Sequence, residues 1–339
     1  MVRATQSKLS IVIPAYNEED NIEILYNQLS DVLSNLGHLY EIIFIDDGSQ
    51  DHTPKLLAAL HNRDKAVKVI RFSRNFGHQA AITAGMTYAT GDAVIIMDAD
   101  LQDPPQLIPD LVAKWYDDYD VVYAIRRKRK ENLLKRAAYF TFYRLFAKVA
   151  DSPIVIDSGD FALLSARVVQ AINNVPEHNR FVRGLRSWVG FSQIGIEYER
   201  DPRHRGQPKY SWFKLVKLAT DGIFSFSTIP LRLASYLGFF TSIISLIYLV
   251  YAILVKLIAD QPPTGWASLV AAVLFIGGVQ LIMLGIVGEY IGKIYDEVRG
   301  RPHYIISQQM GFDDEDARTH SWLHRYHAPT PGPHTPAQG

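Results

Sequence analysis

Two long stretches without a charged residue constrain the fold of this chain more than any other feature of its sequence. They cover residues 233–255 and 266–287, with a short link between them. A helix needs about 20 mostly apolar residues to cross the hydrocarbon core of a bilayer, and both stretches are long enough. The alternative is a buried hairpin of a soluble protein, which the length of the two runs disfavours. The sequence therefore predicts two membrane-spanning helices whose outer ends lie on one side.

The basic residues around these stretches predict their orientation. In the link the only cation is Lys256, whereas several cations precede the first stretch or follow the second: Lys209, Lys214, Lys217, Arg232, Lys293, Arg299 and Arg301. By the positive-inside rule, the link lies outside and the rest of the chain lies in the cytoplasm. Residues 211–229 mix Trp, Phe and Leu with Lys, which is typical of amphipathic helices at a membrane surface.

Composition excludes several kinds of function. Lys plus Arg and Asp plus Glu number 35 each among 339 residues, so the formal net charge is zero and bulk binding of nucleic acid is not supported. The chain has no cysteine, which rules out disulfides, thiolate metal sites and a cysteine nucleophile. Apart from the two apolar stretches, the chain is long enough for a complete enzymatic domain.

Short apolar runs alternate with helical patterns in the amino-terminal part of the chain. The runs cover residues 9–13, 42–45, 67–72, 94–97 and 121–124. The helical patterns between them cover residues 20–36, 53–61, 79–88 and 106–116. Strands rich in Val and Ile, separated by helices, are typical of a mostly parallel sheet covered on both faces. We therefore expect an α/β domain.

Polar loops follow four of these strands directly, at residues 14–20, 46–53, 71–78 and 98–105. Caps and turns use the same residue types, so each loop alone could be a plain turn, with Asn17 or Asp20 capping the next helix. Ligands of open α/β sheets bind at the carboxyl ends of the strands, where all four loops would lie. Together they favour one composite site.

The fourth loop carries the strongest chemical signal. Asp98, Asp100 and Gln102 follow a buried strand, and their oxygens suit a hard cation such as Mg²⁺ or Mn²⁺. Such a cation keeps one or two protein carboxylates and takes its other ligands from water and substrate phosphates. A solvated acidic turn is the alternative for an isolated pair of acids. No glycine-rich phosphate loop occurs in the sequence, so a metal and cations such as Arg74 are expected to hold phosphates.

Four motifs carry a resemblance to a known family. They read V-I-P-A-Y-N-E at residues 12–18, D-D-G-S-x-D at 46–51, R-N-x-G at 74–77 and D-A-D-L-Q-D at 98–103. In order and spacing they resemble the family-2 glycosyltransferases with the GT-A fold. The chain is most similar to the polyprenyl-phosphate branch, which includes dolichol-phosphate mannose synthases and bacterial GtrB-type glucosyltransferases. The resemblance covers about residues 9–210, and the membrane segments also fit.

The resemblance implies roles for the motif residues. The nucleobase and ribose pocket would be lined by Pro14, Ala15, Tyr16 and Glu18, with Asp46 and Asp47 beside it. The rest of the nucleotide-sugar site would comprise Arg74, Asp98, Ala99 and Asp100. A divalent cation, Mg²⁺ or Mn²⁺, would be held by Asp98, Asp100 and Gln102. Such a cation neutralises the charge that builds on the leaving nucleoside diphosphate.

The resemblance also implies where the acceptor binds. Asp157 would lie near the acceptor, and Asp157 and Asp100 are the candidate catalytic residues. A phosphate acceptor is already ionised, so Asp157 either acts as a base or only orients the acceptor. Asp160 has a simpler interpretation, as a turn residue or as the cap of a helix over residues 161–172. Basic side chains that could instead face water or lipid headgroups are the candidates for binding the acceptor phosphate: Arg126, Arg136, Arg203, Arg205 and Lys209.

These observations predict four segments. Residues 1–210 form a cytoplasmic GT-A domain with a Rossmann-like, mostly parallel sheet, and residues 211–231 form interfacial helices. Residues 232–290 form the two transmembrane helices. Residues 291–339 form a cytoplasmic tail that is partly disordered from Asp313 onward, where the sequence becomes acidic and then rich in Pro and His.

The resemblance predicts a metal-dependent, inverting enzyme of a bacterial inner or plasma membrane. It would move one hexose, glucose from UDP-glucose by preference, to a polyprenyl phosphate such as undecaprenyl phosphate. A mannose synthase that uses GDP-mannose is the first alternative. A processive polysaccharide synthase is disfavoured, because no Q-x-x-R-W signature occurs. A non-catalytic nucleotide-sugar sensor is disfavoured by the intact acidic motif. The bilayer is an expected partner, nucleic acid is not, and glycines in the second span favour a homo-oligomer: Gly277, Gly278, Gly285 and Gly288.

Overall fold

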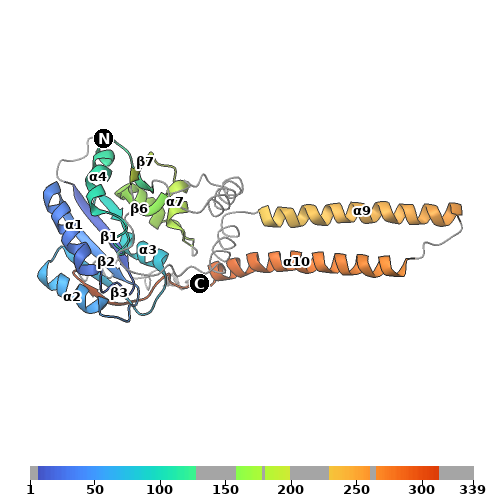
Figure 1. Cartoon of the computed structure of the whole chain (residues 1–339), viewed down its shortest axis with the longest axis horizontal. Coiled ribbons are helices and arrows are strands. Elements are labelled where there is room, and N and C mark those ends of the chain that lie inside the picture. The colour runs from blue at the N-terminus through green and yellow to red at the C-terminus, as the bar shows by residue number, and fades with distance from the viewer. Residues whose placement is uncertain (1–6, 127–157, 178–179, 199–228, 260–264, 313–339) are drawn as a thin grey trace, which may run out of the picture. The chain divides into compact units, whose positions relative to one another are not determined.

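The computed structural model describes residues 7–126, 158–177, 180–198, 229–259 and 265–312 (Figure 1). The chain divides into two compact units. The first comprises residues 1–131, 154–207 and 301–339, and the second comprises residues 132–153 and 208–300. The first unit therefore takes in a segment that follows the apolar stretches in the sequence.

The first unit is built on one eight-stranded sheet in the part of the chain that is described, with the order β7-β5-β6-β4-β1-β2-β3-β8. Its strands are β1 Lys8–Ala15, β2 Leu39–Asp46, β3 Val67–Phe72, β4 Ala93–Ile96, β5 Val121–Arg126, β6 Ser158–Ser165, β7 Gln193–Tyr198 and β8 Ile306–Met310. The pairs β1–β2, β1–β4, β2–β3 and β5–β7 are parallel, whereas β6 and β8 run antiparallel to their neighbours. The predicted α/β fold with a mostly parallel sheet is confirmed.

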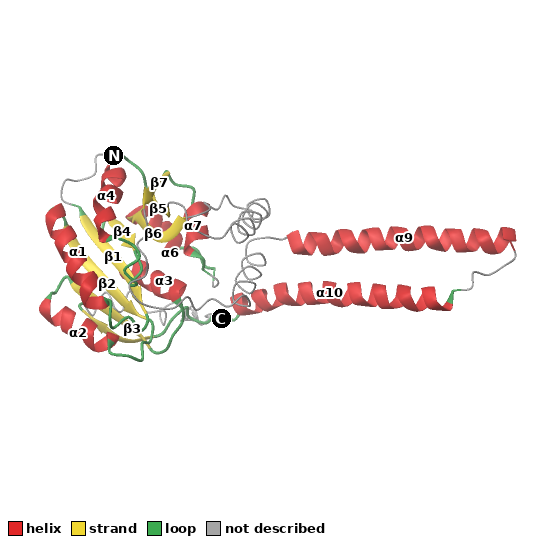
Figure 2. Ribbon diagram, viewed as in Figure 1, coloured by secondary structure: helices red, strands yellow, loops and turns green. Residues whose placement is uncertain are grey.

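Helices cover both faces of this sheet (Figure 2). They are α1 Ile22–Leu36, α2 Thr53–Arg63, α3 His78–Tyr88, the short 3₁₀ helix η1 Pro105–Leu107, α4 Ile108–Tyr116, α6 Ala166–Asn173 and α7 Val182–Trp188. The apolar sides of α1, α2 and α4 pack into one core cluster, and those of α3, α6 and α7 pack into a second cluster on the opposite face. The helices predicted between the first five strands are all present.

The two cores follow from the alternation of side chains along the central strands. In β1, Leu9, Ile11 and Ile13 belong to the first core, whereas Val12 belongs to the second. The second core is tightly packed, because a Cβ atom placed on Gly85 of α3 would lie 2.2 Å from Cγ1 of Val12. Helix α3 therefore sits directly on the sheet and carries its amino-terminal end to the carboxyl edge of the parallel strands.

Two local predictions are wrong. The helix expected from residue 161 begins only at Ala166, and Phe161 lies inside β6. Because β6 is covered on both faces, its apolar residues follow one another without polar residues between them. Such a run lacks the alternation of a half-exposed strand and is easily taken for part of a helix. In α1, the N-cap residue is Asn21, without a side-chain capping bond, so neither Asn17 nor Asp20 caps this helix.

The last strand of the sheet was not expected from the sequence. Residues 306–310 fall in the predicted tail, yet they form β8 along the edge of β3, with Ile70 opposite Gln309 and Phe72 opposite Ile306. The sequence I-S-Q-Q-M is short and mostly polar, which suits an edge strand but resembles a loop. The domain predicted to end at residue 210 therefore lacks one strand of this sheet.

The second unit contains two long helices, α9 Ile229–Ala259 and α10 Trp266–Val298. Both are long and apolar enough to cross a membrane, over Leu233–Tyr251 and Leu269–Val298. Most of their large apolar side chains are exposed, as expected of helices that face lipid. The predicted helical hairpin is thus present in the structure, although α10 extends beyond the uncharged run.

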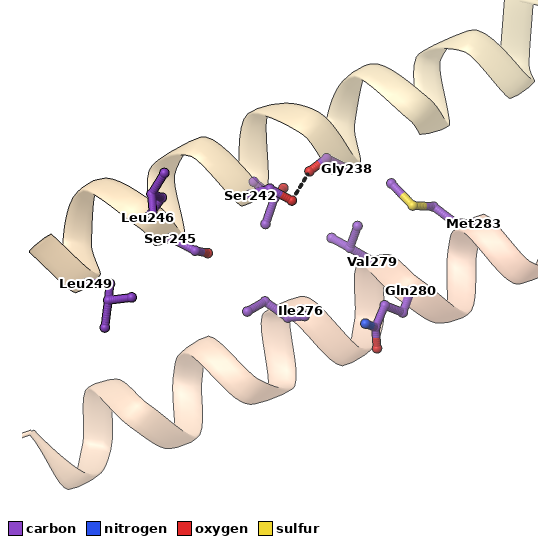
Figure 3. A pocket seen from close by; sticks show the side chains of 10 residues that line it. Gly238, Ser242, Ser245, Leu246, Leu249, Ile276, Val279, Gln280 and Met283 are labelled. Carbon is purple, nitrogen blue, oxygen red and sulfur yellow. Dashed lines mark hydrogen bonds between the residues drawn. The ribbon is translucent and has the colours of Figure 1, made fainter.

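A groove with polar side chains runs between these two helices (Figure 3). Its α9 side carries Thr241, Ser242 and Ser245, and its α10 side carries Gln280. The Ser242 hydroxyl donates to the Gly238 carbonyl oxygen at 2.9 Å, a bond drawn in Figure 3, and the Thr241 hydroxyl bonds to its own helix in the same way. Such bonds to the helix backbone would satisfy the two hydroxyl groups in the apolar interior of a bilayer.

Candidate active site

The four polar loops lie side by side at one edge of the sheet. Because β4, β1, β2 and β3 are parallel neighbours, their carboxyl ends meet there. The loops after β1 and β2 are joined by hydrogen bonds. The backbone N–H of Asn17 donates to the Ser49 hydroxyl at 3.0 Å, and the backbone N–H of Gln50 donates to Oδ1 of Asn17 at 2.8 Å. Asn17 has a positive φ of 55°, which turns its side chain toward the second loop.

Asp46 ends β2 and is completely buried. Its Oδ1 accepts the backbone N–H of Ser49 at 2.8 Å, and its Oδ2 lies 3.2 Å from Nε of Arg71. The carboxylate therefore shapes the turn after β2 and neutralises an arginine from β3. A direct contact of Asp46 with a nucleotide stays a prediction.

Asp47 holds the loop after β3. Its two carboxylate oxygens accept the backbone N–H groups of Phe76, at 2.7 Å, and of Gly77, at 3.0 Å. Burial raises the pKa of Asp47, and these two bonds oppose that rise. The next residue, Gly48, has a φ of +72°, and a Cβ atom there would lie only 2.5 Å from the carbonyl carbon of Arg74. The turn after β2 and the loop of Arg74 are therefore packed backbone against backbone.

The predicted nucleotide-pocket residues of the first and third loops differ in exposure. Pro14 and Ala15 are buried at the end of β1, whereas Tyr16 is 43% exposed. Glu18 is half-buried and accepts a hydrogen bond from the Asn21 side chain at 2.6 Å. Arg74 is exposed, and its guanidinium carbon lies 3.9 Å above the ring of Phe76. Among the predicted pocket residues of these two loops, Tyr16 and Arg74 are therefore the exposed ones.

The acidic loop after β4 has an irregular, well-packed backbone. Leu101 has a positive φ of 59°, and the backbone N–H of Gln102 donates to Oδ1 of Asp100 at 3.1 Å. Asp103 is buried and accepts the Tyr198 hydroxyl at 2.8 Å. Asp103 thus shapes the turn by bonding to β7. Asp98 remains partly open, with 25% of its side chain exposed.

A cluster that the sequence did not predict lies beside Asp98. Asp160, in β6, pairs with Arg183 of α7 through two bonds of 2.6 and 2.7 Å. His78, the first residue of α3, places its Nε2 atom 3.2 Å from Oδ2 of Asp160 and 3.5 Å from Oδ1 of Asp98. Asp160 is therefore neither a turn residue nor a helix cap. An acid, a histidine and an arginine are residue types that often occur in active sites, which is the only signal that the sequence contains. That Asp160 meets His78 and Asp98 depends on the antiparallel placement of β6 next to β4.

The environment separates the pKa values of the two carboxylates in this cluster. Burial raises the pKa of Asp98 to about 6, against the opposing charge of His78. Burial would also raise the pKa of Asp160, but the bonds from Arg183 and His78 outweigh it and hold that pKa well below its usual range. Burial lowers the pKa of His78, yet Asp160 and Asp98 outweigh it and raise this pKa. Asp160 is therefore ionised at neutral pH.

Comparison with known proteins bears on this arrangement. Residues 10–172 match the family Glycosyl transferase family 2, and residues 229–294 match the GtrB C-terminal hairpin. An uncharacterised glycosyltransferase of Synechocystis is 47% identical over 307 residues, which cover 90% of this chain and 96% of that protein. A prophage-derived bactoprenol glucosyl transferase of Shigella flexneri is 43% identical over 302 residues, which cover 89% of this chain and 98% of that protein. The chain belongs to glycosyl transferase family 2.

The carboxyl edge of β4 in this glycosyltransferase offers oxygen atoms that suit a divalent cation. Oδ1 of Asp98 is buried and forms no hydrogen bond among the described residues, although the ring of His78 lies 3.5 Å away. Within the described ranges, no group of three or more His, Asp or Glu side chains could enclose a cation by itself. Asp98, Asp100 and Gln102 carry the oxygen donors that Mg²⁺ prefers, and a cation held there would take most of its ligands from water and donor phosphates.

Several predicted site residues lie outside the described residues of the glycosyltransferase. These are Asp157, Arg136, Arg203, Arg205 and Lys209. Arg126 is the last residue of β5, and only its backbone is described. The assignments of these residues to the acceptor stay predictions.

Proposed function

We propose that this glycosyltransferase transfers one glucose from UDP-glucose to a polyprenyl phosphate at the cytoplasmic face of a bacterial membrane. The observation that carries the proposal is the combination, in one chain, of a carboxylate-bearing strand edge with a long apolar hairpin. A lipid acceptor explains why a sugar-transferring domain needs membrane helices. The similar Shigella flexneri protein, a prophage-derived bactoprenol glucosyl transferase, supports both the sugar and the acceptor.

The donor would occupy the edge formed by the four loops. Tyr16 would stack on the nucleobase with its exposed ring, and Arg74 would approach the diphosphate. Asp98, Asp100 and Gln102 would hold Mg²⁺ or Mn²⁺. When bound, the cation neutralises the charge that builds on the leaving diphosphate. Asp47 would contribute by keeping the loop of Arg74 in place through the backbone of Phe76 and Gly77.

The reaction would need little proton transfer. An oxygen of the ionised acceptor phosphate attacks the anomeric carbon, and the bond from that carbon to the diphosphate oxygen breaks, so that UDP leaves with the electron pair. Attack from the opposite face inverts the configuration. Asp160 is held ionised by Arg183, and its low pKa makes it a weak base. We therefore assign Asp160 the role of positioning His78 and Asp98, and not that of removing a proton. Asp157 would orient the acceptor.

The membrane part would present the acceptor. The cations that flank α9 and α10 favour a cytoplasmic catalytic domain. The lipid phosphate would be held by Arg126, Arg136, Arg203, Arg205 and Lys209. The glycines of α10 would allow helices of neighbouring copies to approach closely in a homo-oligomer.

Transfer to a defined acceptor tests the proposal directly. The purified full-length protein is incubated in detergent with undecaprenyl phosphate, Mg²⁺ and either UDP-glucose or GDP-mannose, and lipid-linked sugar is measured. We expect one glucose per lipid, and loss of transfer when the metal is chelated. Transfer of mannose alone would support the mannose synthase, and a long polymer would support the processive enzyme. Lack of transfer from any nucleotide sugar would refute the proposal.

A charge-removing variant tests the acidic edge. Asp100→Asn keeps the shape of the side chain but weakens the cation site, so transfer should fall at least about 100-fold. The matched control is Asp117→Asn, which alters an exposed carboxylate paired with Lys114 at the end of α4. The control should transfer sugar at the wild-type rate. Full activity of Asp100→Asn would contradict the assignment of Asp100.

A further inference from the structure

The segment that follows the membrane helices is part of the same sheet edge as Arg74. Residues 304–312, which we call the C-terminal strap, lie beyond both family matches, which end at residues 172 and 294. The strap contains β8 and pairs with β3. We propose that Tyr304 of the strap positions Arg74 for the donor through the rings of Phe72 and Phe76. The inference rests on the proposed function, in which Arg74 meets the donor diphosphate.

Three successive ring contacts connect the strap to Arg74. The Tyr304 ring is buried, with 3% exposure, and stacks on Phe72 with 5.0 Å between the centroids and 8° between the planes. Phe72 meets Phe76 edge to face at 5.8 Å. The guanidinium carbon of Arg74 lies 3.9 Å from the centroid of the Phe76 ring. Each contact restricts the next ring, so the position of an exposed cation depends on a buried tyrosine.

Backbone hydrogen bonds hold the strap to the same loop. The N–H of Ser73 donates to the carbonyl oxygen of Ile305 at 2.9 Å. The Ser307 hydroxyl lies 3.1 Å from the Arg71 carbonyl oxygen and 3.2 Å from that of Phe72. The pairing register shifts between Arg71 and Phe72, which marks an irregular end of β3. The strap therefore supports the loop where the regular strand stops.

The loop of Arg74 is thus held from two sides. From the turn after β2, Asp47 binds the N–H groups of Phe76 and Gly77. From the strap, Ile305 and Tyr304 hold its other end. Removal of the strap contacts leaves the Asp47 side intact, so we expect a folded domain in which Arg74 is less well placed.

The far end of the strap is attached to other parts of the domain. The Gln309 amide donates to the Tyr88 hydroxyl at 2.9 Å. Phe312 packs against Tyr88 with 5.3 Å between the centroids, and the Lys68 ammonium lies 5.0 Å from the centroid of the Phe312 ring. These contacts stabilise the strap without touching the loop of Arg74. They supply a matched control in the same strand.

The test compares three variants of the full-length protein in detergent. Tyr304→Leu removes the stack but stays apolar, Tyr304→Phe keeps the ring, and Gln309→Ala loosens only the far end. The affinity for UDP is measured by calorimetry, and KM and kcat for the donor are measured by transfer. For Tyr304→Leu we expect Kd and KM to rise about three- to tenfold, with kcat changed less than about twofold, as expected for a lost aromatic contact. Tyr304→Phe and Gln309→Ala should keep the wild-type Kd and KM.

The outcomes separate this inference from the proposed function. If the wild-type protein binds no nucleotide and transfers no sugar, the proposed function fails and the inference fails with it. If the wild type binds UDP and folded Tyr304→Leu binds it equally well, the inference alone is overturned. A fall in kcat with unchanged KM would also overturn it. If Tyr304→Leu does not fold, Phe76→Leu decides, because it removes the half-buried ring between Phe72 and Arg74, and an unchanged Kd in that variant overturns the inference.

Discussion

Replacing Arg183 with Gln should both destabilise this glycosyltransferase and slow it. Asp160 has only 5% of its side chain exposed and receives two short bonds from Arg183. Removal of one partner from a buried ion pair costs about 3–5 kcal/mol. Since the Arg183 side chain is 35% exposed, water replaces part of the interaction in the variant. We therefore expect the free energy of unfolding to fall by about 2–3 kcal/mol.

The loss should depend on pH in a defined direction. The folded-state pKa of Asp160 lies below its unfolded value, so the ionised group stabilises the protein above the unfolded pKa of about 3.9. This stability disappears as the pH falls through the folded pKa. Arg183→Gln raises the pKa of Asp160 toward its ordinary value. The stability difference between wild type and variant should therefore be complete at pH 7 and shrink below about pH 4.

Thermal unfolding of the purified protein, followed by tryptophan fluorescence at several pH values, measures this effect. A loss of 2–3 kcal/mol corresponds to a fall in Tm of about 4–12 °C for a domain of this size. Transfer activity should fall as well, because His78 and Asp98 lie beside the unpaired Asp160. The matched control is Arg167→Gln, which breaks a similar pair with Asp120 and should leave activity unchanged.

A double-variant cycle with Asp160→Asn completes the test. If Arg183 acts through Asp160, the combined variant should be less destabilised than the sum of the two single variants. Strict additivity, or an Arg183→Gln protein with wild-type stability and activity, would refute the reasoning. A loss of activity in Arg167→Gln equal to that in Arg183→Gln would show that the effect is not specific to the site.

Three further predictions concern other parts of the domain. Gly48→Val places side-chain atoms against the backbone of Arg74, so we expect a loss of about 2 kcal/mol in thermal unfolding and a higher donor KM, and an unchanged KM would contradict this packing. Burial raises the pKa of Glu41 in β2, but hydrogen bonds from Ser10 and Thr90 and the charge of Lys68 outweigh it and lower this pKa to about 2. Glu41→Gln removes that charge, so the free energy of unfolding should fall by about 3 kcal/mol at pH 7 and little below pH 2, measured by the same unfolding series; an equal loss at both pH values would disprove the charge effect. Tyr198→Phe removes the hydrogen bond to Asp103 and should lower the free energy of unfolding by about 1 kcal/mol, measured by thermal unfolding. The kcat should not change, which steady-state transfer assays would check.

The sequence predicted well those elements whose signal is local. The strands β1 to β5 are runs of Val and Ile, and the helices between them show their apolar face at helical spacing, so both were expected near their observed bounds. The hairpin was evident because uncharged runs of this length are rare outside membranes. The four loops were expected to meet because parallel strands place their carboxyl ends at one edge.

Elements that depend on distant partners were not predicted. In β6, Phe161 and Leu163 are buried against one core and Leu164 against the other, so the run lacked the alternation of a half-exposed strand. In β8, the polar residues suit an edge, and only pairing with β3 makes the segment a strand. Neither position could be inferred from neighbouring residues in the sequence.

The site shows the same division. By itself the sequence determined the chemistry of the edge, because Asp98, Asp100 and Gln102 must follow a buried strand wherever that strand lies. Only the tertiary structure decided which groups lie beside Asp98. His78 and Asp160 are 82 positions apart and meet because β6 returns antiparallel beside β4. Contacts between residues distant in sequence depend on the packing of whole elements, which local propensity does not encode.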